Sequence, residues 1–246
     1  PACHGLVRLP VAERAGLIWA VLRPGPPIDL DAFLCGYDSV LGQFDFARWH
    51  LFARRSVPGP NWKIAYDGYL DFYHLQILHK ATFGTDLPNR ALYDAYGPHQ
   101  RVSFPNPRLL RFDERPEANW DTRELLAGVW TIFPHVSIAT FDAGTRAVLV
   151  SQLFPGASVA ESVTVQSYLL AKEPDQSERE AAEKMFELLG YVVREEDYAT
   201  GLRQQRALLT GARGEVLFGR NEGGGQRFHQ HLDRLLAGNV EGDSHG

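Results

Sequence analysis

Residues 61–79 read NWKIAYDGYLDFYHLQILH, and this stretch decides how the rest of the chain is interpreted. It places Asp71 three residues before His74, and His79 five residues after His74. Residues three apart on an α-helix share a face, so a helix here would direct Asp71 and His74 into the same space. His74 and His79 would lie about 140° apart, because each helical residue turns by about 100°. The two imidazoles can therefore reach one point only if the helix bends, ends or contains a π-bulge between them.

The spacing of the two histidines is a weak signal when taken alone. With 9 histidines in 246 residues, chance gives about 0.3 pairs at this spacing. Further evidence must therefore come from the composition and from other parts of the chain.

The composition is that of a soluble globular protein, and the length suits one large domain, or two small ones, with an ample core. Of the 246 residues, 44% are hydrophobic and 22% are charged. A net charge of -5 makes nucleic acid and anionic membranes poor candidate partners. No apolar run approaches the roughly 20 residues that a membrane helix needs. The start, PACHGLVRLP, lacks both a methionine and the apolar core of a signal peptide, so we expect a chain that begins inside a longer protein. Cys3 and Cys35 make no disulfide framework, which favours a cytoplasmic location.

Hydrophobic patterns predict an α+β fold, because strands are grouped between helices without βαβ alternation. The closely spaced last strands favour antiparallel pairing. Expected strands are residues 17–22, 49–57, 91–97, 99–104, 129–141, 146–154 and 162–171. Expected helices are residues 29–34, 61–79 capped by Asn61, 117–126, 177–209 capped by Ser177 with Glu180, and 225–238.

Asp197 is the most informative single residue of the long predicted helix. Its face is apolar or small apart from one glutamine, whereas Glu195 and Glu196 are expected to turn toward the polar side. An ionised carboxylate is costly to bury unless it is paired or bound to metal. On this evidence an ion pair with an arginine and a role as a metal ligand are about equally supported. Two glycines on the same face indicate a large group packed against the helix. The residues sharing this face are Phe186, Gly190, Val193, Gly201, Gln204 and Leu208.

Asp71 shows the same pattern on its own predicted helix, where it shares a largely apolar face with Asp67 and His74. Two histidines and a carboxylate on separate helices suit a facial triad that holds ferrous iron in an oxygenase. The same donors also suit zinc, so a zinc hydrolase is an alternative. Asp86 and Asp94 are weaker candidates for the third ligand, because nothing around them demands burial.

Other residues favour structural roles. His229 and His231 would lie about 200° apart on a helix and cannot share a metal there, so one is expected to pack and one to face water. His135 is expected to be a satisfied core histidine, and Cys35 a small buried hydrophobe. The glycine-rich GEVLFGRNEGGG lacks the strand and Lys-Ser/Thr of a phosphate loop.

Four blocks of the chain, taken in order, resemble one known family. NWK followed by an acid, two residues, His, four residues and His resembles the signature of the catalytic domain of Rieske-type non-haem iron ring-hydroxylating oxygenases, α subunit. EEDYATGLRQQRAL is similar to the family's second block, LPVAERAGLIWAVL to the segment after its Rieske domain, and FGRNEGGGQRFHQHLDRLL to its closing helix. The resemblance therefore covers nearly the whole chain.

The resemblance implies His74, His79 and Asp197 as ligands of one mononuclear Fe²⁺. It implies for Asp71 a hydrogen bond across a subunit boundary toward a histidine of the neighbouring iron–sulfur cluster. The implied fold is a helix-grip, START-like antiparallel sheet packed on a long helix, and family members are commonly trimeric. One departure is that the CxH and CxxH pairs of a Rieske domain are absent, since Cys3 and Cys35 are the only cysteines.

We therefore expect residues 1–246 to form a single catalytic domain, in which 1–22 would follow a Rieske domain and 61–79 and 191–208 form the iron site. A [2Fe–2S] cluster and a homotrimer are expected only in a full-length form. The expected reaction is mono- or dioxygenation of a small apolar, aromatic substrate with O₂, as in the catabolism of aromatic compounds. A ferredoxin or reductase would supply electrons. The alternative is a helix-grip module that binds a small ligand without catalysis.

Overall fold

The chain folds into two units, Pro1–Trp49 and His50–Gly246, in a computed structural model. The structure describes residues 5–84, 91–105, 114, 116–119, 126–142 and 144–238. The expectation of one domain over 1–246 stays a prediction. No helix within these described ranges is both long and apolar enough to cross a membrane.

The first unit is built on a small hairpin, β1 (Val11–Arg14) with β2 (Leu17–Ala20). Its two-residue turn has positive φ at Ala15 (58°) and Gly16 (72°), the geometry that favours a tight hairpin. Short helices follow: α1 (Leu30–Leu34), α2 (Asp38–Leu41), η1 (Gly42–Phe44) and η2 (Phe46–Arg48). Cys35 lies exposed in the left-handed conformation that ends α1, so its predicted burial is wrong. Cys3 lies outside the described residues.

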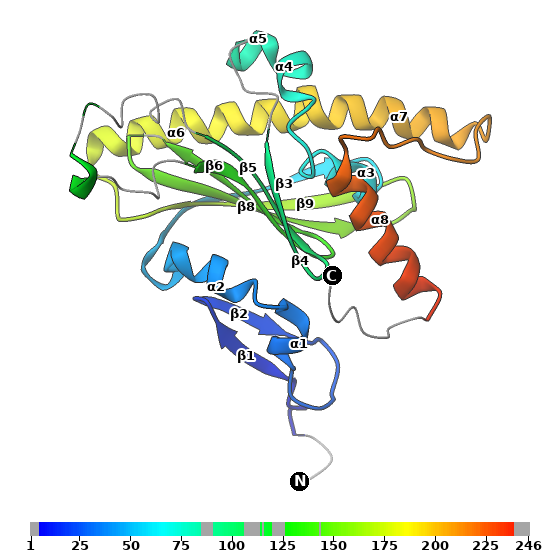
Figure 1. Ribbon diagram of the computed structural model, residues 1–246, viewed down its shortest axis with the longest axis horizontal. Coiled ribbons are helices and arrows are strands. Elements are labelled where there is room, and N and C mark those ends of the chain that lie inside the picture. The colour runs from blue at the N-terminus through cyan, green and yellow to red at the C-terminus, as the bar shows by residue number, and fades with distance from the viewer. Residues whose placement is uncertain are drawn as a thin grey trace. The chain divides into compact units, whose positions relative to one another are not determined.

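The second unit contains a seven-stranded antiparallel sheet in the order β3-β9-β8-β7-β6-β5-β4 (Figure 1). The strands are β3 (His50–Gly59), β4 (Leu92–Tyr96), β5 (His99–Pro105), β6 (Leu126–Ile132), β7 (Val136–Asp142), β8 (Arg146–Pro155) and β9 (Ser162–Leu170). The single strand predicted over residues 129–141 is wrong, because a turn around Pro134 splits it into β6 and β7. Proline cannot donate to a ladder, which explains the break.

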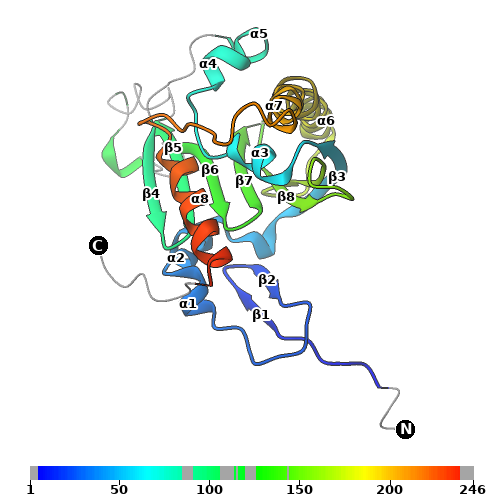
Figure 2. The same ribbon diagram turned by 90° about the vertical axis from the view of Figure 1, so that its right-hand side faces the viewer.

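One long helical run crosses a face of this sheet, made of α6 (Gln176–Tyr191), the π-helical η6 (Val192–Tyr198) and α7 (Ala199–Leu209) (Figure 1). Figure 2 views this run nearly end-on beside β8 and β3. The capping box uses Asp175 and Glu178 rather than the predicted Ser177 and Glu180, because the helix begins earlier. The antiparallel sheet packed on a long helix confirms the predicted α+β, helix-grip fold.

The predicted helix over residues 61–79 is wrong as one element. Asn61 does cap a helix, but α3 (Trp62–Asp67) stops after six residues. The chain then turns before the single-turn helices α4 (Leu75–Leu78) and α5 (Lys80–Phe83). Of the helix predicted over 117–126, a short η4 (Glu117–Asn119) is described, and residues 120–125 lie outside the described part.

The closing helix α8 (Gly223–Leu236) packs so close to the turn after α3 that a Cβ at Gly224 would collide with the Leu70 carbonyl. Phe228 of this helix is fully buried in a cluster with Tyr66 and Phe133. The glycine-rich start of α8 therefore serves close packing, which is consistent with the absence of a phosphate-loop motif.

Candidate metal centre

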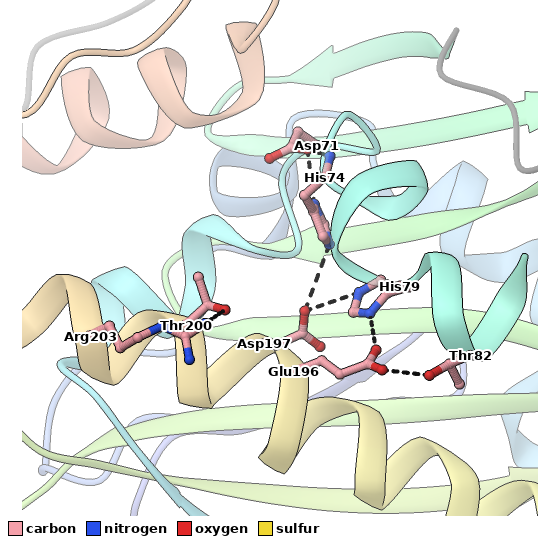
Figure 3. A network of polar contacts seen from close by, with 8 residues as sticks. All are labelled: Asp71, His74, His79, Thr82, Glu196, Asp197, Thr200 and Arg203. Atoms are coloured by element: carbon pink, nitrogen blue, oxygen red, sulfur yellow. Dashed lines mark hydrogen bonds and ion pairs between the residues drawn. The ribbon is translucent and has the colours of Figure 1, made fainter. Parts of the chain in front are cut away.

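Three side chains from two segments converge at one point: His74 and His79 flank α4, and Asp197 comes from the long helix (Figure 3). His79 Nε2 lies 3.1 Å from Asp197 Oδ1, and His74 Nε2 lies 3.8 Å from the same oxygen. One ligand atom from each residue falls within 4.8 Å of the other two. The structure thus brings together the three residues predicted as metal ligands.

The two histidines converge because the helix between them is a single turn. His74 forms the N-cap of α4, and His79 lies between α4 and α5 with φ −100° and ψ 13°. The ring centroids are 5.2 Å apart. The sequence predicted that the helix must bend, end or contain a π-bulge between the two histidines. The structure shows that the helix ends on both sides of α4, whereas the π-helix lies in η6.

Asp197 comes from η6, at the middle of the long helix. A Cβ at Gly201 would lie 2.8 Å from Pro60, and one at Gly190 would collide with the Arg55 guanidinium. The glycines on this face do accommodate large neighbours, as the sequence predicted. Within the described ranges, Asp197 pairs with the two histidines and with no arginine.

Glu196 is the residue that sequence analysis missed. Its Oε2 lies 2.5 Å from His79 Nδ1, and its Oε1 accepts a hydrogen bond from Thr82 Oγ1 at 2.5 Å. The Glu196 side chain is 13% exposed, less than the 24% of Asp197. The prediction that Glu196 faces the polar side is wrong, because a π-helix turns less per residue than an α-helix and brings adjacent residues toward the same side. The sequence signal that could have identified Glu196 is its position directly before Asp197.

Asp71 holds the other histidine from within the same segment. Its Oδ1 accepts hydrogen bonds from His74 Nδ1 (3.0 Å) and from the His74 backbone N–H (3.1 Å). Asp71 lies in the turn between α3 and α4, so the predicted helical face shared by Asp67, Asp71 and His74 is not formed. Its proximity to His74 comes from this turn.

Burial and the neighbouring groups shift the pKa values of Asp71, Glu196 and His79 in opposite directions. Burial alone raises the pKa of Asp71, but the hydrogen bonds and charge of His74 outweigh it and hold that pKa below its usual range. Burial also raises the pKa of Glu196, and Thr82 and His79 together lower it below the ordinary value. Burial lowers the pKa of His79, whereas Asp197 and Glu196 raise it, with a net rise. Both carboxylates therefore favour their ionised form, which accepts the Nδ1–H of the histidine.

The donor set fits a divalent first-row metal. With each Nδ1 held by a carboxylate, both Nε2 atoms face Asp197 and are the ring nitrogens left to bind a metal. Two imidazole nitrogens and one carboxylate oxygen match the set that ferrous oxygenases use, and also a set that zinc accepts. Of the other candidates, Asp94 is engaged by Arg101 at 2.6 Å, and Asp86 lies outside the described residues.

A cavity of about 240 Å³ adjoins the centre on the side of His74 and Asp197. Asp67 lines it and pairs with His229 Nε2 at 3.0 Å. His231 contacts Phe133 and is also partly buried, so neither is fully solvated. The lining of this cavity includes Ile64, Leu78, Thr200, Gln204, Leu217 and Phe218.

Comparison with known families identifies the chain. Residues 46–238 match the model of the ring hydroxylating alpha subunit (catalytic domain), which is well over half of the sequence. The chain belongs to this family. The predicted resemblance is thereby confirmed, and no curated protein gives a significant match.

Solved structures share the fold of this ring-hydroxylating subunit. The quaternary ammonium Rieske monooxygenase CntA in complex with L-carnitine is 17% identical, with a TM-score of 0.70 over 95% of this chain. NdmA of Pseudomonas putida CBB5 with caffeine is 15% identical, with a TM-score of 0.57 over 98% of the chain. The chain spans 61% of that CntA chain and 68% of that NdmA chain.

Proposed function

We propose that this chain is the iron-binding catalytic part of an O₂-dependent hydroxylase. The observation that carries the proposal is the convergence of His74, His79 and Asp197, with both histidines oriented by carboxylates. Ferrous iron bound there would supply the activation of O₂ that hydroxylation of a small organic substrate requires.

The residues of the chain divide this task. His74 and His79 would each donate Nε2, and Asp197 would donate Oδ1 and reduce the net charge of the site. Asp71 and Glu196 keep the Nδ1 protons in place, which fixes the tautomer and the ring orientation. Burial of His79 at 3% side-chain exposure keeps water from one side of the centre.

Monooxygenation is the reaction we favour, because solved structures with the same fold include Rieske monooxygenases. Electrons would come from outside these 246 residues, since the sequence lacks the CxH and CxxH pairs of a [2Fe–2S] site. We propose that a Rieske cluster fed by a ferredoxin or reductase supplies them in a homotrimer of full-length form. In that assembly Asp71 would lie on the path of electrons from a neighbouring subunit.

Metal analysis tests this proposal directly. We expect one iron per chain after anaerobic loading with Fe²⁺, and no stoichiometric acid-labile sulfide. Parallel loading with Zn²⁺, followed by an assay of O₂ uptake with a chemical reductant, separates oxygenase from zinc hydrolase chemistry. Failure to retain iron, or uptake of O₂ that is equal with and without iron, contradicts the proposal.

A further inference from the structure

The two carboxylates that hold the histidine Nδ1 atoms are themselves fixed in different ways. Asp71 has a short side chain, whose Oδ1 accepts both from His74 Nδ1 and from the His74 backbone N–H. The local turn therefore sets the position of this carboxylate. Glu196 reaches across from the long helix with a longer side chain, and within the described ranges its carboxylate is bonded by two side chains, those of His79 and Thr82.

Thr82 binds the second carboxylate oxygen of Glu196. Its Oγ1 donates to Oε1 at 2.5 Å, while Oε2 lies 2.5 Å from His79 Nδ1 (Figure 3). Thr82 lies on α5, three residues after His79, a spacing at which helical side chains are neighbours. Its backbone N–H also donates to the His79 carbonyl at 3.0 Å. The three residues thus form a closed ring of hydrogen bonds, in which each carboxylate oxygen has its own partner.

Burial makes this ring important for the orientation of the imidazole. The side chains of His79 and Glu196 are 3% and 13% exposed, so water has little access to replace a lost donor. The last torsion of a glutamate has only broad minima, so a carboxylate held at one oxygen can rotate about that bond. A donor on the other oxygen restricts this rotation and keeps Oε2 in line with Nδ1.

We propose that Thr82 is a positioning residue of the metal centre, which orients the Glu196 carboxylate so that Oε2 accepts the His79 Nδ1–H. The inference rests on the proposed function, because His79 Nε2 is the atom expected to bind iron. Thr82 does for Glu196 what the His74 backbone amide does for Asp71. The role requires the hydroxyl group rather than the shape of the side chain, because the donor is Oγ1–H.

The alternative is that the Thr82 hydroxyl only fastens α5 to the long helix and has no effect on the imidazole. Both roles predict some loss of thermal stability when the hydroxyl is removed, so stability does not separate them. A positioning role acts through Glu196, and its effect on metal affinity must therefore vanish when the Glu196 carboxylate is already absent. This dependence distinguishes the two roles.

A double-mutant cycle on the full chain tests this dependence. Thr82→Val removes the hydroxyl and keeps the branched shape, whereas Thr82→Ser keeps the hydroxyl. Glu196→Ala is made alone and together with Thr82→Val. Thr210→Val is the matched control, since the Thr210 hydroxyl donates to the Ala207 carbonyl at 2.7 Å, at the end of α7. Dissociation constants for Zn²⁺ and, without oxygen, for Fe²⁺ are measured on each protein.

We expect Thr82→Val to weaken binding of both metals by about 10-fold, the lower end of the range for groups that support a ligand. Thr82→Ser should stay within about 2-fold of the wild type, because it keeps the donor. In the Glu196→Ala background, Thr82→Val should change metal affinity by less than about 2-fold, since the group through which it acts is gone. Thr210→Val should leave metal affinity unchanged.

NMR of the metal-free protein gives a readout that needs no metal. An isotope-labelled His79 ring reports whether Nδ1 carries the proton and how fast that proton exchanges with water. In the wild type and in Thr82→Ser we expect a slowly exchanging Nδ1–H, because Glu196 accepts it in a buried place. Exchange should be faster in Thr82→Val and in Glu196→Ala, and unchanged in Thr210→Val.

Several results would overturn the proposal. These are unchanged metal affinity and unchanged proton exchange in Thr82→Val, equal losses in Thr82→Val and Thr82→Ser, or a Thr82→Val effect on metal affinity that is as large without the Glu196 carboxylate as with it. The last result would show that Thr82 only fastens α5. A wild type that binds neither metal contradicts the proposed function, whereas the exchange rates of the metal-free proteins still decide whether Thr82 orients Glu196.

Discussion

The two histidines of the metal centre are supported in different ways. Asp71 holds His74 from three residues away in sequence, and both side chains are 24% exposed. Glu196 holds His79 from 117 residues away, with side chains 13% and 3% exposed. The chemistry is the same, a carboxylate accepting from Nδ1, but the first support is local and half-buried whereas the second is long-range and buried.

This difference predicts unequal consequences of mutation. A partly exposed ion pair contributes little to stability because water screens it. A buried carboxylate whose partner is removed leaves an unpaired group at a cost of about 1–3 kcal/mol or more. The pair of Glu196 and His79, here the His79 half of the centre, is therefore expected to stabilise both the fold and the metal site. The pair of Asp71 and His74, the His74 half, is expected to stabilise mainly the metal site.

Asp197 is common to both halves, so its removal has the largest expected effect. Asp197→Ala should abolish stable iron binding and cost several kcal/mol of metal-dependent stabilisation, since the bound metal stabilises only the folded state. Melting curves with and without Fe²⁺ measure this. Glu195→Ala is the matched control, because Glu195 lies two residues from Asp197, is 49% exposed and pairs with Arg194. Similar iron-induced shifts in both variants would contradict the role of Asp197.

Glu196→Ala should have the next largest effect. We expect iron affinity to fall by about 10- to 100-fold, as is usual when the group that orients a ligand is removed. The metal-free protein should also lose about 1–3 kcal/mol of unfolding free energy, because His79 Nδ1 and Thr82 Oγ1 lose their acceptor. Urea unfolding of the metal-free variant measures the second effect, and an unchanged midpoint would remove the distinction between the two halves.

Asp71→Ala should lower iron affinity by about 10-fold, at the lower end of the same range, because His74 loses its acceptor. The metal-free protein should change by less than about 1 kcal/mol, since the pair is partly exposed. In a full-length form carrying the Rieske domain, Asp71→Asn should keep iron yet lower steady-state hydroxylation. Re-oxidation of the reduced cluster at the wild-type rate, with full product yield, would show that Asp71 is not on the electron path.

The smallest effect is a pH dependence of the metal-free protein. The pKa of Glu196 is lowered from 4.5, so its contribution to stability is present above pH 4.5 and is lost as pH falls through the folded-state value. The pKa of His79 is raised from 6.5, so its contribution is present below pH 6.5 and is lost as pH rises through the folded-state value. The difference in unfolding midpoint between wild type and Glu196→Gln should therefore be largest between pH 4.5 and 6.5. A difference that is constant with pH would indicate an uncharged hydrogen bond.

Much of the fold followed from the sequence because its signals are local. Runs of apolar and β-forming residues predicted β3, β4, β5, β8 and β9, although β6 and β7 were expected as one strand, and Asn61 predicted the start of α3 by its capping side chain. The errors arose where tertiary packing overrides local propensity. Residues 68–74 have a helical pattern, yet the chain turns there, and Gly224 of α8 packs against the Leu70 carbonyl in that turn.

The sequence by itself determined the family, the α+β class and the identity of His74, His79 and Asp197 as candidates, because these depend on residue types at fixed spacings. Only the tertiary structure decided that Glu196 supports His79, since that pair joins segments 117 residues apart through a π-helix that no local pattern indicates. It also decided that a row of buried polar side chains crosses the strands from β5 to β9. Each of its residues is unremarkable in its own strand, and only the register of five adjacent strands aligns Gln100, Thr131, Ser137, Ser151 and Gln166.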